Sequence, residues 1–258
     1  MKTINILWTG GLDSTYRIIE LSRLNVTIQP FYILDKTRKS IAQELKAMRK
    51  ITIDIKNNAN TKAKLLPFKI INISDIHEDN SITKAWSILN KKYILGSQYD
   101  FLARFAKQYK LKLEVGLEKS ERSKATTAIK GETTIYLEKR KLDDEIYSVY
   151  VIDAVHSSNE GALIFQDLLL PASLWNMTKL DEVEGYKKLG FEKTLKETWF
   201  CHRPIFGLPC GHCNPCKDCL NEGMAYRIPR IGFLLGGVRR LLLGAFHFIM
   251  RLNRYKKD

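Results

Sequence analysis

The chain has 258 residues, of which 45% are hydrophobic, and its 42 Lys and Arg outnumber 28 Asp and Glu to give a formal charge of +14. This length and composition support a buried core, which excludes a disordered chain, a collagen-like chain and a small disulfide scaffold. The first residues reach Gly10 and Asp13 before any apolar stretch long enough for a secretory signal, so we expect a cytoplasmic protein. All five cysteines lie between Cys201 and Cys219, which favours metal binding over disulfides.

The first part of the chain alternates between two kinds of pattern. Short apolar runs at 4–8, 31–34, 68–73 and 111–115 predict strands, and apolar residues at helical spacing between them predict helices. Strands separated by helices are typical of a parallel sheet. We therefore predict an α/β fold with a doubly wound parallel sheet whose core is complete by about Glu118.

The pattern changes after this core. Two β-type runs, at 133–137 and 146–151, predict a β-hairpin, which we interpret as an insertion over about 120–153. Thr178 followed by Asp181 predicts the capped start of a further helix. We divide the chain into three parts: an α/β domain over 1–200, a cysteine module over 201–226 and a basic tail over 227–258.

A glycine loop joins the first predicted strand to the first helix. It reads Trp8-Thr9-Gly10-Gly11-Leu12-Asp13-Ser14-Thr15. The glycines let the backbone approach a phosphate, the helix start attracts an anion, and Ser14 and Thr15 add hydroxyl donors. The loop has neither the Gly-Lys-Ser/Thr ending of a Walker loop nor the spacing of a dinucleotide fingerprint, so it predicts another kind of nucleotide site. The alternative interpretation is that Asp13 only caps the helix.

The cysteines have the spacing of a metal knuckle. We assign four of them as zinc ligands: Cys201, Cys210, Cys213 and Cys216. Two-residue gaps direct successive sulfurs at one metal, although on spacing alone Cys219 could replace Cys216. Four sulfur ligands close the coordination sphere, which predicts a structural zinc rather than a catalytic one. The spacing differs from those favoured by iron–sulfur clusters, and we interpret His202 and His212 as bystanders.

The tail is apolar and strongly basic. From Arg227 to Asp258 it holds six Arg and two Lys against one Asp, which gives +7. Arg239 and Arg240 interrupt its apolar stretch, so a membrane-spanning helix is not expected. On a helical wheel the glycines and most cations lie opposite the leucines, which predicts an amphipathic helix. Such a helix can fold back, pair with a second copy in a homodimer, or lie on an anionic membrane surface as a peripheral anchor, and we favour these over nucleic acid.

The two motifs together resemble the N-type ATP pyrophosphatases, and within them the 7-cyano-7-deazaguanine synthases. The glycine loop is similar to their Ser-Gly-Gly-x-Asp-Ser loop, with Thr9 in place of the first serine. Other segments that resemble this family are Gly96–Leu102, Pro171 with Thr178–Glu182, Thr198–Cys201 and Pro209–Cys213. The resemblance covers about residues 4–220 and implies a HUP-like α/β core.

The resemblance also implies ligands and site residues. ATP, Mg²⁺ and Zn²⁺ are the implied cofactors. The implied catalytic residues are Asp13, associated with Mg²⁺, Ser14, and Lys179, which would supply positive charge unless it is simply an exposed first-turn lysine. The residues implied in nucleotide binding are Trp8, Thr9, Gly10, Gly11, Leu12, Asp13, Ser14 and Thr15 of the loop, with Asp35, Gly96 and Gln98.

The implied reaction turns the carboxylate of 7-carboxy-7-deazaguanine into a nitrile, using ATP twice and ammonia once. The chain departs from the family because its central loop lacks Pro-Gly-Arg-Asn and its 120–153 segment has no counterpart. A ligase for another carboxylate, on a small molecule, a protein or a glycan precursor, therefore stays open. Two further alternatives are a tRNA thiolase that uses Cys219 and a non-catalytic zinc module that binds nucleic acid or a membrane.

Overall fold

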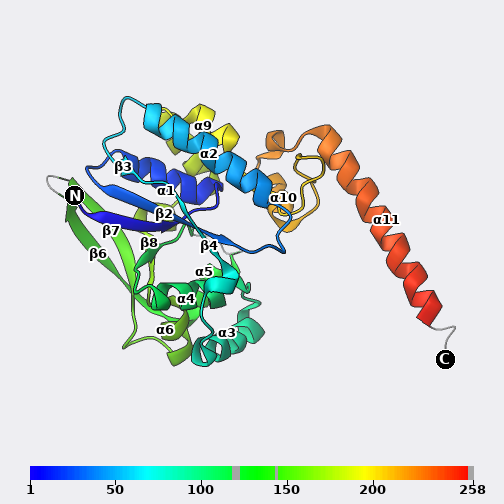
Figure 1. The fold of residues 1–258 in the computed structure, drawn as a ribbon, viewed down its shortest axis with the longest axis horizontal. Coiled ribbons are helices and arrows are strands. Elements are labelled where there is room, and N and C mark those ends of the chain that lie inside the picture. The colour runs from blue at the N-terminus through cyan, green and yellow to red at the C-terminus, as the bar shows by residue number, and fades with distance from the viewer. Residues whose placement is uncertain (118–122, 143–144, 255–258) are drawn as a thin grey trace. The chain divides into compact units, whose positions relative to one another are not determined.

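In a computed structural model of the protein, residues 1–117, 123–142 and 145–254 are described, with the backbone alone over 243–254 (Figure 1). The chain divides into two compact units. The first contains Met1–Asp35 and Glu44–Thr198, and the second contains Lys36–Gln43 and Trp199–Asp258.

The first unit is built on an eight-stranded sheet. Its strands are β1 (Thr3–Leu7), β2 (Thr27–Leu34), β3 (Lys64–Leu65), β4 (Lys69–Asn72), β5 (Leu113–Glu114), β6 (Thr134–Leu142), β7 (Glu145–Asp153) and β8 (Leu168–Pro171). The order is β3-β2-β1-β5-β8-β7-β6, and β4 also pairs with β2. The β6–β7 and β7–β8 pairs are antiparallel, and the other strand pairs of the described residues are parallel. The predicted α/β class with a mostly parallel sheet is confirmed.

One part of the topology differs from the prediction. The parallel core is not complete at Glu118, because β8 follows the hairpin and pairs parallel with β5. The predicted hairpin exists as β6 and β7. Residues Val149–Val151 of β7 also pair with β8, so the hairpin extends the same sheet. The four residues of β8 are too few for periodicity to separate a buried strand from a helix, and this explains why the sequence did not show it.

Nine helices lie wholly or mostly in the described part of the first unit. They are α1 (Leu12–Ser22), α2 (Ile41–Asn57), α3 (Asn80–Tyr93), α4 (Gln98–Gln108), α5 (Lys124–Glu132), α6 (Asn159–Phe165), α7 (Ala172–Trp175), α8 (Lys179–Lys188) and α9 (Glu192–Glu197). Figure 1 shows α1, α2 and α9 on one face of the sheet and α3, α4, α5 and α6 on the other. The α4 face buries Tyr99, Leu102, Ala103 and Ala106, as their spacing predicts. Each face of the sheet is therefore covered by an apolar helix surface.

The helix predicted after Thr178 is confirmed as α8. Its first turn has a capping box, in which Thr178 Oγ1 accepts from the Asp181 N–H and Asp181 Oδ2 accepts from the Thr178 N–H. Gly190 follows the helix with φ of +77°, a conformation that glycine adopts without the steric cost of a side chain. The capping box fixes where α8 begins, and Lys179 is the first residue of the helix.

The start of α3 provides a test of how one carboxylate stabilises this unit. Asp79 caps α3 by accepting from the N–H groups of Ser81 and Ile82, and Lys107 pairs with it. The Lys107 ammonium, the Ser81 hydroxyl and the Ile82 N–H, which all donate to its carboxylate, hold the pKa of Asp79 below its usual range. A lowered pKa in the folded state means that the stabilisation is present above the unfolded pKa of about 3.9 and is lost as the pH falls towards the folded pKa.

We expect Asp79→Ala to lower the free energy of unfolding by about 1 kcal/mol at neutral pH, because it removes a helix N-cap. Urea unfolding checks this value, and the difference from the wild type should narrow when the measurement is repeated below about pH 4. A difference that is the same in neutral and acidic solution would contradict the role of the ionised cap.

The second unit combines a cysteine knuckle with two helices, α10 (Asn214–Asn221) and α11 (Arg230–Arg254). A 3-10 turn at Ala225–Arg227 lies between them, and the Arg227 guanidinium lies 4.7 Å from the centre of the Phe200 ring. The predicted tail helix is confirmed over the described residues. Among those residues no helix combines the length and apolar character needed to cross a bilayer.

Candidate nucleotide and metal sites

The glycine loop lies where the order of the parallel sheet reverses. From β1 the chain moves outwards to β2, β3 and β4, and then returns to place β5 on the other side of β1. In open α/β sheets, ligands bind at the carboxyl ends of the strands at such a reversal. The loop Thr9–Gly11 follows β1 at this point, and Val115–Leu117 follow β5. The topology therefore selects this edge as the candidate site.

The loop conformation depends on Gly10. Gly10 has φ of +69°, and a Cβ there would lie 3.1 Å from the Met48 side chain and 3.2 Å from the Glu44 carbonyl oxygen of α2. Gly11 is the N-cap of α1, and no side chain caps this helix. The interpretation of Asp13 as a helix cap is therefore wrong. The first N–H groups of α1 remain directed towards the loop, where an anion can accept from them.

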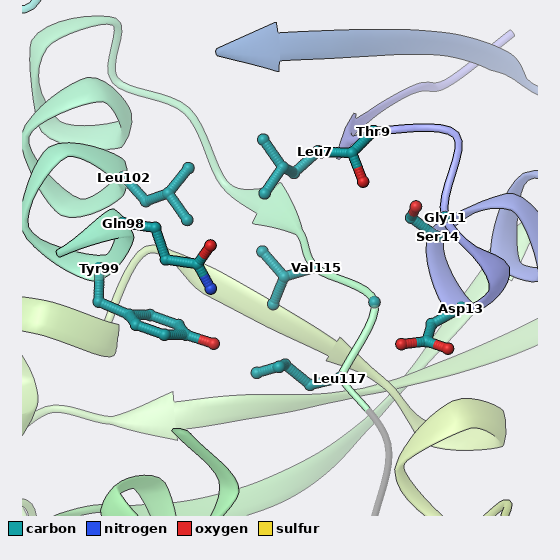
Figure 2. Close-up of a pocket in the computed structure, with 11 residues that line it drawn as sticks. Leu7, Thr9, Gly11, Asp13, Ser14, Gln98, Tyr99, Leu102, Val115 and Leu117 are labelled. Carbon is teal, nitrogen blue, oxygen red and sulfur yellow. The ribbon is translucent and has the colours of Figure 1, made fainter. Parts of the chain in front are cut away.

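A cavity of about 160 Å³ opens between the loop and α4. Figure 2 shows Gln98 and Tyr99 extending from α4 on one side, and Thr9, Ser14 and Asp13 on the other. Apolar side chains lie between them, namely Leu7, Val115 and Leu117, and Leu102 of α4 lies beside Gln98. Burial raises the pKa of Tyr99 to about 12, so its hydroxyl stays neutral at physiological pH. The cavity thus has polar groups on two opposite sides, at the loop and at the start of α4, with apolar side chains between them.

Lys179 reaches the loop from the first turn of α8. Its Nζ donates to Asp13 Oδ1, and it lies 3.3 Å from Glu182 Oε1. The Lys179 side chain is only 14% exposed and that of Glu182 is fully buried. The interpretation of Lys179 as an exposed first-turn lysine is therefore wrong. A buried carboxylate holds this cation beside Asp13, which itself lines the cavity.

α8 is fixed against α1 by aromatic contacts. Tyr186 donates its hydroxyl to the Leu12 carbonyl at 2.7 Å, and its ring contacts that of Tyr16. Gly185 permits this contact, because a Cβ there would lie 2.5 Å from the Tyr16 hydroxyl. Burial raises the pKa of Tyr16 to about 12, and the charges of Glu20 and Glu182 add to the effect. The position of Lys179 is thus set by the packing of α8 on α1.

Several residues predicted in nucleotide binding do not line the cavity. Trp8 and Thr15 are fully buried, and the Trp8 indole donates to Thr15 Oγ1 at 2.9 Å. Leu12 is also buried. These three support the loop from the core. Asp35 follows β2 at the same edge of the sheet, and the Gly96 carbonyl accepts from the Trp86 indole beside α4.

A buried ion pair behind the loop was missed by sequence reasoning. Arg17 of α1 donates to both oxygens of Glu114 on β5, at 2.7 Å and 3.4 Å. Arg17 also bonds Glu20, which accepts from Ser173, and burial raises the pKa of Glu20. Arg17 and Glu114 are 97 residues apart, so no local pattern pairs them. The pair ties α1 to β5, the strand that Val115 and Gly116 of the cavity follow.

Gly116 was also missed, although a glycine after a predicted strand is a recognisable signal. A Cβ on Gly116 would lie 2.7 Å from the Ser14 nitrogen and 3.0 Å from the Ser14 Cα. We expect Gly116→Ala to push the segment after β5 away from α1 and to lower the free energy of unfolding by about 1–3 kcal/mol. Thermal or urea unfolding measures this.

The matched control for that variant is Gly96→Ala, because the atom nearest to an added Cβ is 3.9 Å away and its backbone needs no positive φ. We expect this control to unfold like the wild type within about 0.5 kcal/mol. Equal stability of Gly116→Ala and the control would contradict the close approach of the two segments.

In the second unit, the four predicted ligand cysteines lie together. The Sγ atoms of Cys201, Cys210, Cys213 and Cys216 all lie within 4.8 Å of one another. Three of the Sγ–Sγ distances are 3.4, 3.8 and 4.0 Å. A tetrahedral zinc with bonds of about 2.3 Å separates its sulfurs by about 3.8 Å, and a disulfide by about 2.05 Å. The cluster therefore has the geometry to hold a metal ion such as zinc.

The open choice between Cys216 and Cys219 is settled by position. Cys219 Sγ donates to the Met224 carbonyl at 3.2 Å and lies outside the four-sulfur cluster. Burial raises the pKa of the Cys219 thiol, and the residue is 3% exposed. His212 is a bystander, since its ring stacks on Phe233 and its Nε2 lies 3.0 Å from the Phe233 carbonyl oxygen.

The knuckle rests on the start of α11. A Cβ on Gly236 would lie 1.9 Å from the Cys210 carbonyl oxygen, and one on Gly232 would lie 2.4 Å from that of Pro209. Glycines weaken a helix by about 1 kcal/mol each, but here they let it approach the loop that carries Pro209 and Cys210. The first turns of α11 are thus part of the cysteine module.

Comparison of the sequence with models of known protein families gives no match, and comparison with curated protein sequences gives none either.

Proposed function

We propose that this protein is an ATP-dependent ligase that forms AMP and pyrophosphate, with a doubly wound HUP-like core and a structural zinc. The observation that carries the proposal is the glycine loop at the sheet reversal, with Asp13 and Ser14 lining a cavity and Lys179 held beside them. Such a loop, followed by an uncapped helix start, suits a polyphosphate.

The residues fit Mg²⁺ and ATP in complementary ways. Asp13 offers a carboxylate, the ligand type that Mg²⁺ takes alongside phosphate oxygens. Lys179 would move from Asp13 to a phosphate when the magnesium complex arrives, because Asp13 lines the cavity and the Lys179 ammonium already donates to it. Typical ligand sites have a volume of about 300–1,000 Å³, and this cavity is smaller. Only part of the nucleotide would therefore lie inside it.

The reaction that we propose activates a carboxylate. A carboxylate oxygen attacks the α-phosphorus of ATP, the bond to pyrophosphate breaks, and an acyl adenylate forms. Ammonia then attacks the carbonyl carbon and AMP leaves, which gives the amide. Lys179 and the N–H groups of α1 would stabilise the charge that develops on the departing pyrophosphate. In a 7-cyano-7-deazaguanine synthase, a second ATP activates the amide oxygen, and loss of AMP gives the nitrile.

The alternatives differ in what they require of this chain. A ligase for another carboxylate uses the same residues and differs only in the acceptor. A thiolase would need a reactive cysteine, and Cys219 is buried with a raised pKa, which speaks against it. A non-catalytic module would have no use for a lysine held at the glycine loop.

ATP turnover tests the proposal. The purified protein is incubated with ATP and Mg²⁺, and AMP is separated from ADP, with 7-carboxy-7-deazaguanine and ammonia present or absent. AMP that depends on this substrate, with a nitrile detected by mass, is the expected result. AMP formed only with another carboxylate would change the acceptor. No AMP with any carboxylate or with tRNA, in protein with intact zinc and fold, would contradict the ligase function.

A further inference from the structure

The start of α11 carries an exposed apolar stripe. Five side chains form this α11 stripe, each between 54% and 75% exposed: Ile231, Leu234, Val238, Leu241 and Leu242. They recur at the three- and four-residue spacing that places side chains on one face of a helix. If nothing covers this continuous apolar face, it contacts water, which is unfavourable.

The cysteine module occupies a different face of the helix. Gly232 and Gly236 contact the carbonyl groups of Pro209 and Cys210. At 3.6 residues per turn these glycines point away from Leu234, Val238 and Leu241. The module therefore leaves the α11 stripe uncovered, and its contacts fix the helix so that the stripe faces outwards from the knuckle.

Positive charge borders the stripe. Arg230 and Arg239 lie at the two edges of the stripe on the helix, and Arg240 lies on the opposite side. No Asp or Glu occurs from 223 to 257, and the segment from Arg227 to Asp258 has a side-chain charge of +7. An apolar face flanked by cations, with no acid nearby, matches a surface that offers acyl chains beneath anionic headgroups.

We propose that α11 lies on an anionic lipid bilayer, with the α11 stripe among the acyl chains and the flanking arginines at the lipid phosphates. A second copy would bring two arginine-bordered stripes together with no acidic partner, which like-charge repulsion disfavours. Nucleic acid would satisfy the cations but leave the stripe in water. A bilayer surface offers phosphates to the arginines and acyl chains to the stripe. The inference does not depend on the proposed ligase function.

Co-sedimentation of the full-length protein with lipid vesicles tests the inference. We expect binding to an equal mixture of phosphatidylcholine and phosphatidylglycerol, weakened by salt, and much weaker binding to phosphatidylcholine alone. Leu241→Asp should abolish binding, and Arg239→Gln should weaken it about 5-fold, since each cation near the surface contributes about 1 kcal/mol. Ile53→Asp is the matched control, because Ile53 of α2 is 58% exposed on another helix.

Zinc content and circular dichroism verify that each variant keeps the knuckle and the helix. Equal binding to the two lipid compositions, or equal loss in Leu241→Asp and Ile53→Asp, would overturn the inference. Light scattering tests independently whether a second copy of the chain covers the stripe instead. A wild-type dimer that Leu241→Asp converts to a monomer would assign the stripe to a second copy and overturn the lipid proposal.

Discussion

Lys179→Met is expected to weaken binding of the magnesium–ATP complex about 10- to 100-fold, because a hydrogen bond to a charged group contributes about 1.5–3 kcal/mol. The physical reason is the position of the cation. Its side chain is 14% exposed, it donates to Asp13, and buried Glu182 keeps it at the glycine loop. Titration calorimetry measures the affinity without any knowledge of the acceptor substrate.

The control for this variant is Lys188→Met in the last turn of α8, which removes an exposed lysine from the same helix. We expect it to bind ATP like the wild type. Asp13→Asn should instead raise the Mg²⁺ concentration that ATP binding requires, because the amide is a weaker ligand than the carboxylate. Wild-type affinity in Lys179→Met would remove this lysine from the nucleotide site.

Cys213→Ser is expected to abolish stoichiometric zinc binding and to unfold the cysteine module. Structural zinc sites contribute about 10–16 kcal/mol of apparent binding free energy, which exceeds the total stability of many domains. Metal analysis should find one zinc in the wild type and none in the variant. Limited proteolysis should then cut the variant near Arg227, because the knuckle that supports the start of α11 is lost.

Cys219→Ser provides the matched comparison, since Cys219 is buried beside the cluster but bonds only the Met224 carbonyl among the contacts described for its sulfur. We expect this variant to keep one zinc and to resist proteolysis like the wild type. Loss of zinc from Cys219→Ser together with its retention in Cys213→Ser would reverse the ligand assignment.

The features that could be predicted are those that local chemistry fixes. The glycine loop at the end of β1, the capping box of α8 and the ligand cysteines each need particular residue types within a short stretch of chain, and all lie where their spacing indicates. The amphipathic pattern also located α4 and α11. Nucleotide binding and ligase activity remain predictions from these motifs.

The features that could not be predicted depend on pairing between distant segments. β8 enters the sheet beside β5, and Arg17 finds Glu114, because the sheet brings residues together that no periodicity relates. The same holds for Lys179. The sequence allowed two interpretations of this residue, a lysine of the site or an exposed lysine on the surface. Only the packing of α8 on α1 places it at Asp13 and removes it from water.

The sequence by itself determined the α/β class, the position of the glycine loop and a cysteine cluster with the spacing of a metal site, because backbone freedom, helix capping and sulfur spacing act over a few residues. Only the structure showed that Cys216, and not Cys219, is the fourth member of that cluster. The tertiary structure alone decided which loop residues face the cavity and which are core. It also decided that Gly232 and Gly236 serve the knuckle, and which face of α11 stays exposed. Those outcomes depend on burial, and burial is set by what packs against each residue across the fold.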